Sequence, residues 1–225
     1  MKMRVFLNVL REVNWLKTIY FNFHYFSVSK AIHLPVFIFR STQLVEVKGK
    51  VLLNCPIRTG IVRIGIHDVG TVDIKYNRTI WQCSGTVIFD GSTSIGSGTK
   101  LSINRQGTIN FGDKFCVTGN SSIICSKKIT FGKECLLSWD ILIMDTDFHN
   151  IYNEQKVLVN TSKSIHIGNH VWIGCRNIIL KGVNIADNVV IAAGSKITKN
   201  VNQSDCIVGG QDMQTVIKDK IYWEK

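Results

Sequence analysis

The stretch that decides the fold is Ile167-Gly168-Asn169-His170-Val171-Trp172-Ile173-Gly174-Cys175, and its pattern continues to Ile197. An isoleucine stands at every sixth position: Ile167, Ile173, Ile179, Ile185, Ile191 and Ile197. A six-residue period fits neither an α-helix, whose period is about 3.6 residues, nor an array of hairpins, which needs longer strands. Turn-forming pairs such as Asn169-His170 and Asp187-Asn188 separate the apolar positions. The pattern therefore predicts an all-β solenoid, in which three units close a triangular coil of about 18 residues with each isoleucine pointing inward.

The same signal continues, less regularly, towards the N-terminus. Two further coils are predicted by Phe111-Gly112, Val117 and Ile123, and by Phe131-Gly132, Leu137 and Ile143. Weaker matches near Ile64-Gly65 and Ile95-Gly96 place the start of the solenoid near residue 46 and its end near residue 205. We therefore expect an N-terminal segment over residues 1–45, a solenoid over 46–205 and a C-terminal cap over 206–225.

No hexad occurs between Ile143 and Ile167, so residues 144–166 are expected to form an arm loop that projects from the solenoid. Long loops on rigid scaffolds often carry function. At the other end, Gln211 to Lys220 are expected to form a short helix over the last coil, which would otherwise expose a strand edge.

The N-terminal segment has a different pattern, since apolar residues from Phe6 to Tyr20 follow helical spacing and the aromatic run from Tyr20 to Phe26 is strand-like. Two interpretations remain open. The segment folds back as a lid on the first coil, or it contacts an anionic membrane surface through its aromatic and basic side chains, either instead of the lid or as a further role of it.

The charge balance favours an anionic partner, because 27 Lys and Arg against 16 Asp and Glu give a net charge of +11. That partner could be nucleic acid, an anionic membrane face or a phosphorylated small molecule, but the basic residues are dispersed and form no known nucleic-acid motif. Lys17, Lys30 and Arg40 interrupt the apolar N-terminal stretch, so no membrane-spanning segment is predicted, and we expect a cytoplasmic protein. The seven cysteines contain no Cys-x-x-Cys pair and are interpreted as reduced packing residues.

The hexad Ile167 to Cys175, followed by Ile191-Ala192-Ala193-Gly194-Ser195 and Thr198-Lys199, resembles the hexapeptide-repeat acyltransferases. The segment from Ser138 to His149 is similar to the corresponding part of bacterial polysaccharide O-acetyltransferases. The resemblance implies a left-handed parallel β-helix, a hand that periodicity alone cannot give because parallel crossovers are usually right-handed. It also implies a homotrimer that uses acetyl-CoA to acetylate a sugar hydroxyl of a surface glycan or its precursor.

Acetyl transfer to an alcohol requires a base, because an alcohol is a poor nucleophile at neutral pH. Of the six histidines, His149 alone lies in the arm beside carboxylates, and the resemblance assigns it the role of base. In an extended segment Asp147 would share its face and could orient the imidazole, with Asp145 as the alternative. The same relatives place an asparagine about one coil earlier, so Asn120 either binds the acceptor or the oxyanion or is simply a turn residue.

The resemblance places coenzyme A in a groove between neighbouring solenoids, beside the tryptophan of the Val-Trp-Ile-Gly motif. The expected cofactor-binding residues are Trp172, Cys175, Ala193, Ser195, Thr198 and Lys199. The family's closing Gly-x-Pro-Ala-Lys or Arg is missing here, because Gln211-Asp212-Met213 follows Gly210, and Lys218 is the candidate replacement for that basic contact.

Two other functions are the alternatives to this one. A metalloenzyme resembling the gamma-type carbonic anhydrases would use His149, His166 and His170, but His166 and His170 are four residues apart in a six-residue repeat, so no metal site is expected. A non-catalytic solenoid scaffold would have no need for a histidine-bearing arm.

Overall fold

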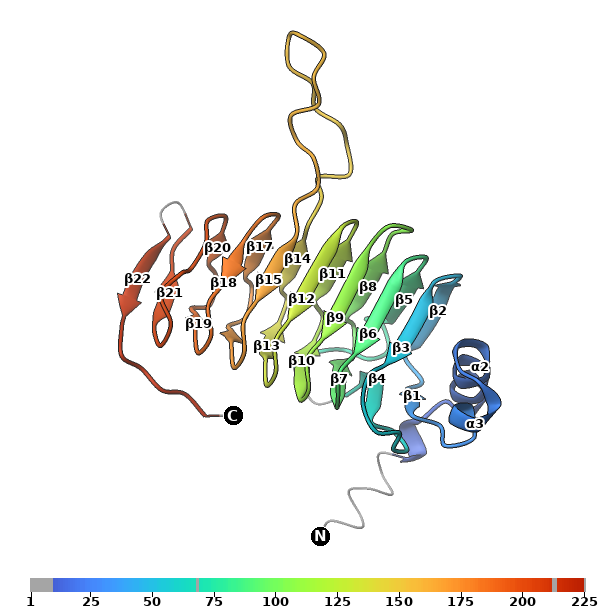
Figure 1. Cartoon of the computed structure of the whole chain (residues 1–225). Helices are drawn as coiled ribbons and strands as arrows, with labels where there is room; N and C mark the ends of the chain where they lie inside the picture. The colour runs from blue at the N-terminus through green and yellow to red at the C-terminus, as the bar shows by residue number, and fades with distance from the viewer. Residues whose placement is uncertain (1–9, 68, 212–213, 225) are drawn as a thin grey trace.

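A computed structural model describes residues 10–67, 69–211 and 214–224, and it consists mainly of three sheets that form the faces of one solenoid (Figure 1). Sheet I contains, in order, β1 (Val36–Ile38), β4 (Val62–Ile66), β7 (Thr93–Gly96), β10 (Phe115–Gly119), β13 (Leu136–Trp139), β16 (Trp172–Ile173), β19 (Val190–Ile191), β21 (Ile207–Gly209) and β22 (Thr215–Lys218). Sheet II contains β2 (Thr42–Val47), β5 (Thr79–Cys83), β8 (Lys100–Ile103), β11 (Ser122–Cys125), β14 (Leu142–Met144), β17 (Ile178–Leu180) and β20 (Lys196–Ile197). Sheet III contains β3 (Lys50–Leu53), β6 (Thr86–Phe89), β9 (Thr108–Phe111), β12 (Lys128–Phe131), β15 (Ile165–Ile167) and β18 (Asn184–Ile185).

The chain visits sheets I, II and III in turn, so three successive strands make one coil. Neighbouring strands within each sheet are parallel, except for the antiparallel pair of β21 and β22. The chain therefore has three kinds of corner, which we call the I–II, II–III and III–I corners after the sheets that they join. The expected all-β solenoid is confirmed.

The isoleucines of the hexad form the core, as predicted. Ile167, Ile173 and Ile179 lie in sheets III, I and II, and each is completely buried. Within sheet II, Ile179 pairs in register with Ile143 on one side and Ile197 on the other. Each coil buries its apolar residues against the next coil, which is why the six-residue period persists through this part of the chain.

The coils before the hexad are wider, and this explains their irregular sequence pattern. Their strands are mostly four or five residues long, whereas β16 to β20 are two or three residues long. Phenylalanines fill the wider interior: the rings of Phe111 and Phe131 stack at 5.5 Å between centroids and 2° between planes. The extra residues shift the period without changing the order of the sheets.

The N-terminal segment covers the first coil through α2 (Trp15–Tyr25), with the short α3 (Val28–Ala31) beside it (Figure 1). Asn22 of α2 donates to the carbonyl of Val36 at 2.7 Å and accepts from its N–H at 3.1 Å, and the hydroxyl of Thr18 accepts from the N–H of Ile38 at 3.0 Å. These buried side chains satisfy the backbone groups along the open edge of β1. The structure thus gives the segment the predicted position of a lid.

Two N-terminal expectations are corrected. The aromatic run from Tyr20 is helical through Tyr25 and not strand-like, because Phe21 packs edge-on against Trp81 of the first coils at 5.1 Å. Parallel pairing starts with Val36 on Val62, which is earlier than residue 46. The part of the helical pattern that begins at Phe6 lies outside the described residues.

The C-terminal expectation of a short helix over Gln211 to Lys220 is wrong for the described residues. Thr215–Lys218 form β22, an antiparallel strand on β21, because the last strand of sheet I offers unpaired backbone groups. The following residues run back across the solenoid, where Trp223 stacks on His170 at 4.1 Å and donates its indole N–H to the carbonyl of His170 at 3.0 Å.

The arm leaves the solenoid after β14 and returns at β15, and it projects far from the coils (Figure 1). Its described contacts with itself include a single antiparallel bridge between Tyr152 and Leu158. The arm does not disturb the sheets on either side, since β15 pairs with β12 and β18 in register. Among the described residues, no helix is long and apolar enough to cross a membrane.

Candidate active site

Asp145 anchors the arm where it leaves the II–III corner. Its carboxylate is completely buried and accepts hydrogen bonds from the backbone N–H groups of Ser126, Lys127 and Lys128 at 2.6–2.8 Å. It also accepts from the thiol of Cys125 at 3.4 Å, and burial together with this carboxylate raises the pKa of that thiol. Asp145 closes the preceding coil's corner, so the structure gives it no part in orienting His149.

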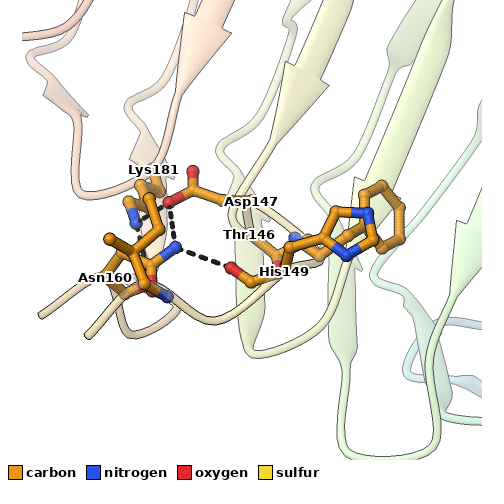
Figure 2. Close-up of polar contacts among 7 residues, drawn as sticks. Thr146, Asp147, His149, Asn160 and Lys181 are labelled. Carbon is orange, nitrogen blue, oxygen red and sulfur yellow. Dashed lines mark hydrogen bonds and ion pairs between the residues drawn. The ribbon is translucent and has the colours of Figure 1, made fainter. Parts of the chain in front are cut away.

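Asp147 fixes the base of the arm through Lys181 and Asn160. Its Oδ2 pairs with Lys181 Nζ and accepts from Asn160 Nδ2 at 2.9 Å, while Lys181 also donates to the carbonyl of Asn160 at 2.9 Å (Figure 2). Asn160 donates in addition to the carbonyl of His149 at 2.7 Å and accepts from the N–H of Ile151 at 2.7 Å. Asp147, Asn160 and Lys181, which we call the arm latch, join both legs of the arm to the next coil.

The arm latch keeps Asp147 ionised over the ordinary pH range. Hydrogen bonds from Lys181 and Asn160 lower the pKa of this carboxyl below its usual value. A lowered pKa means that the stabilisation is present at neutral pH and is lost only as the pH falls through that lowered value. The ion pair of the arm latch is therefore present at neutral pH.

The structure does not place Asp147 on the imidazole of His149, and that expectation is corrected. Figure 2 shows the ring of His149 on the side away from the Asp147 carboxylate. The carboxylate of Asp147 is held instead by the ammonium group of Lys181, because a hydrogen bond between two charged groups is strong. His149 is exposed, and its backbone N–H donates to the carbonyl of Asp147 at 2.7 Å. Its main chain is fixed while its ring is open to an incoming molecule.

Asn120 lies at a different corner from the arm. It occupies the I–II corner with a positive φ of 45°, and its amide donates to Asp140. The equivalent corners of other coils also carry positive φ values, at Gly98, Asp140, Arg176 and Gly194. The expected turn role is therefore present, and within one chain Asn120 does not meet His149. Its proposed role in the transfer stays a prediction.

The expected cofactor residues are divided between sheet I and the two corners that flank sheet II. Trp172 begins β16 of sheet I, where its ring lies 5.9 Å from that of Trp223, and Cys175 and Ala193 lie at the I–II corner. Thr198 and Lys199 follow β20 at the II–III corner. The indole of Trp172 donates to the hydroxyl of Ser138 at 3.3 Å and remains partly exposed. Ala193, Thr198 and Lys199 are exposed, so these side chains are available to a ligand.

Ser195 is occupied by the solenoid itself. It is almost completely buried, its hydroxyl donates to the carbonyl of Ala192 at 2.8 Å, and its N–H donates to the side chain of Asn177 at 2.6 Å. These bonds close the last I–II corner. The structure therefore gives Ser195 a packing role in this chain.

Sequence reasoning missed Lys181 and Asn160, which complete the arm latch. Lys181 is 34 residues from Asp147, and no local pattern marks either partner. Lys181 directly follows β17, and Asp147 lies shortly after β14. The two residues meet only because β14 and β17 are paired in neighbouring coils. The three histidines of the metalloenzyme alternative lie in the arm, on β15 and at the following corner, and the described residues contain no metal-binding cluster of His, Cys, Asp or Glu.

Comparison with known proteins finds matches to one class of solenoid over part of the chain. Residues 164–199 match the family described as bacterial transferase hexapeptide (six repeats). The solved structure of the polySia specific acetyltransferase NeuO covers 82% of this chain and 89% of its own, with a TM-score of 0.50 and 22% identity. These matches confirm the resemblance to the hexapeptide-repeat acyltransferases and the left-handed parallel β-helix that it implies.

Two curated relatives are more similar in sequence over shorter stretches. The polysialic acid O-acetyltransferase of Neisseria meningitidis is 43% identical over 67 residues, which is 28% of this chain and 31% of the relative. The galactoside O-acetyltransferase of Escherichia coli (strain K12) is 36% identical over 94 residues, which is 41% of this chain and 46% of the relative. The matched stretches thus span between about a third and a half of these relatives.

The arm latch makes a direct prediction. We expect Lys181→Met to loosen the arm, because it removes the charged partner of Asp147 and the donor to Asn160. Amide hydrogen exchange over residues 146–160 should become roughly tenfold faster or more. The control is Lys127→Met, which removes an exposed lysine at the same kind of corner. Equal exchange in the two variants would show that Lys181 does not hold the arm.

Proposed function

We propose that this protein is an O-acetyltransferase that moves an acetyl group from acetyl-CoA to a sugar hydroxyl of a surface glycan or its precursor. The observation that carries the proposal is His149, whose carbonyl accepts from Asn160 in the arm latch while its ring is exposed on the arm. The relatives named as polysialic acid and galactoside O-acetyltransferases support both the chemistry and a carbohydrate acceptor. The family match over the last coils supports the same class.

In this proposal His149 is the general base. The imidazole takes the proton of the acceptor hydroxyl as the oxygen attacks the thioester carbon, and the tetrahedral intermediate then expels the coenzyme A thiolate. The imidazolium returns the proton to the leaving sulfur, so the charge and the protons balance. An amide such as that of Asn120 could stabilise the oxyanion if a second chain brings it to the arm.

The donor is expected to bind beside sheet II, where small residues allow a close approach. Ala193 and Gly194 leave room at the I–II corner, and nothing lies within 4 Å of the position that a Cβ on Gly194 would occupy. Lys199 offers a cation for a phosphate, and Thr198 offers a hydroxyl. Trp172 supplies an apolar surface for the pantetheine chain.

The first test is His149→Ala. We expect the acetyl transfer rate to fall by about 10²–10⁴, the usual contribution of a general base, while acetyl-CoA affinity measured by calorimetry is unchanged. His166→Ala is the matched control, because His166 is an exposed histidine on β15, outside the arm. If His149→Ala kept more than about a tenth of the wild-type rate, the base would lie elsewhere.

We further propose that the working unit is a homotrimer. The arm exposes the large apolar side chains Phe148, Ile151, Tyr152, Val157 and Val159, each more than half accessible to solvent in one chain. Sheet II also presents the partly exposed Ile178 between the two corners that carry the expected donor residues. A neighbouring copy would cover these surfaces and complete the site, and closed cyclic symmetry would repeat the same interface three times.

Light scattering tests the trimer. We expect three times the chain mass, and a smaller particle for the double variant Phe148→Asp/Val157→Asp, whose charges would have to be buried at the interface. Thr161→Asp/Ser162→Asp adds the same charge near the end of the arm without replacing an apolar contact. A stable wild-type monomer that transfers acetyl groups at full rate would contradict the proposal.

Finally, we propose a cytoplasmic protein whose lid contacts an anionic membrane surface. The outward face of α2 carries Trp15, Leu16, Ile19, Tyr20 and Phe23, of which Leu16 is 83% exposed. The first turn of α2 has no acidic residue, and Arg11 and Lys30 flank the helix as exposed cations. Aromatic side chains favour the membrane interface and cations favour anionic lipids.

Vesicle co-sedimentation tests this contact. We expect Leu16→Ser/Phe23→Ser to bind phosphatidylglycerol vesicles at least about tenfold more weakly than the wild type, since both outward side chains would enter the interface. The control, Val216→Ser/Ile217→Ser, removes exposed apolar residues at the opposite end of the solenoid. Equal binding by the two variants would exclude α2 as the contact.

A further inference from the structure

A cavity lies at the N-terminal end of the solenoid, away from the arm. It has a volume of about 660 Å³ and lies between α2, the corner from β1 to β2, the end of β4 and the loop before β5. The expected donor residues, 172–199, belong to the last coils at the other end (Figure 1). The cavity is therefore separate from the site proposed for acetyl-CoA.

The cavity is strongly basic. Four cationic side chains line it, and these are Lys17, Arg40, Lys75 and Arg78. Glu12 is the only carboxylate among its described lining residues. In the part of the chain that the structure describes, none of the four cations forms an ion pair. Their charge is thus available to a ligand.

The walls of the cavity are held by the fold. Lys17 Nζ donates to the carbonyl of Thr42 at 2.6 Å, which fixes the ammonium at the junction of α2 and β2. The N–H of Arg40 donates to the carbonyl of Glu12 at 3.0 Å, beside the bridge between Val13 and Phe39. The backbone that carries the guanidinium of Arg40 is therefore held by Glu12 and by the bridge of the preceding residue, Phe39.

A bulge in β4 shapes the floor. The register with β7 shifts between Ile64 and Ile66, and Gly65 at this point has a φ of +89°. A Cβ on Gly65 would collide with the hydroxyl of Thr42, so only glycine fits this close approach. Bulges commonly redirect the chain beside binding sites. His67, two residues after Gly65, lines the cavity, and its Nδ1 lies 3.3 Å from Ser97 Oγ.

We propose that this cavity binds the phosphate or diphosphate group of an anionic ligand. Two guanidinium groups offer paired N–H donors to phosphate oxygens, and two ammonium groups add charge. A single carboxylate would neutralise only part of this charge, whereas a diphosphate carries several negative charges and acceptor oxygens. The proposal concerns binding at the first coils and stands whether or not His149 is the base.

Calorimetry with inorganic pyrophosphate tests the proposal on the full chain without acetyl-CoA. We expect Arg40→Ala/Arg78→Ala to weaken binding at least about tenfold, and the wild-type affinity to fall as salt is raised, because exposed charges are screened. The matched control is Lys127→Ala/Lys128→Ala, which removes two exposed cations at another corner. Equal loss in both double variants, or no saturable binding by the wild type at low salt, would overturn the proposal.

Two further measurements identify the source of the phosphate. If Arg40→Ala/Arg78→Ala also loses binding to phosphatidylglycerol vesicles, the cavity takes a lipid headgroup; if it loses pyrophosphate alone, the ligand is a soluble phosphate. Both results support the site. The same variant should keep its acetyl-CoA affinity, and a matching loss there would reassign the cavity to the donor and overturn the proposal. Failure of the His149→Ala test would leave this binding experiment unaffected.

Discussion

Each coil presents a row of backbone N–H and C=O groups to the next coil, together with an inward row of apolar side chains. Neither row is satisfied by one coil alone, so every coil depends on its neighbours for its hydrogen bonds and its buried surface. The register of Ile143, Ile179 and Ile197 shows both requirements met at one position in successive coils. We call this repeated pairing of coils the ladder. The arm and the ligand-binding positions are attached to the ladder, and the terminal segments cover its ends.

The two ends of the ladder are closed by different means. At the first coil the side chains of Thr18 and Asn22 take the place of a neighbouring strand and bond to the backbone of β1. At the last coil β22 adds an antiparallel strand to β21. The first solution removes an open edge that would otherwise pair with another chain, whereas the second moves the edge of sheet I outward to β22, whose side chains are exposed. The N-terminal solution also leaves an apolar helix face and a basic cavity at one end of the molecule.

The ladder also determines where functional groups can be placed. Positions that point inward are filled by the core, so ligand-binding groups must lie on outward positions, at the corners or in the arm. The arm is inserted at one corner without shifting β15, since hydrogen bonding between coils involves only the strands. Asp145 and Asp147 serve this insertion, because one closes the corner and the other attaches the arm to Lys181. His149 is left open as a result.

The sequence by itself determined the solenoid, because the hexad from Ile167 to Ile197 is a local pattern that repeats with each face of the coil. It also located the arm, as a gap in that pattern, and the histidine within it. It could not give the role of Asp147, since the partner Lys181 is 34 residues away and is aligned only by the stacking of β14 on β17. At the N-terminal end the sequence indicated helical spacing up to Tyr20 and a lid, but it gave neither the extent of α2 nor the strand β22, because both take their form from the strand edges that they cover. Local side-chain order thus decided the coil, whereas contacts between coils decided the caps, the arm latch and the separation of Asn120 from His149.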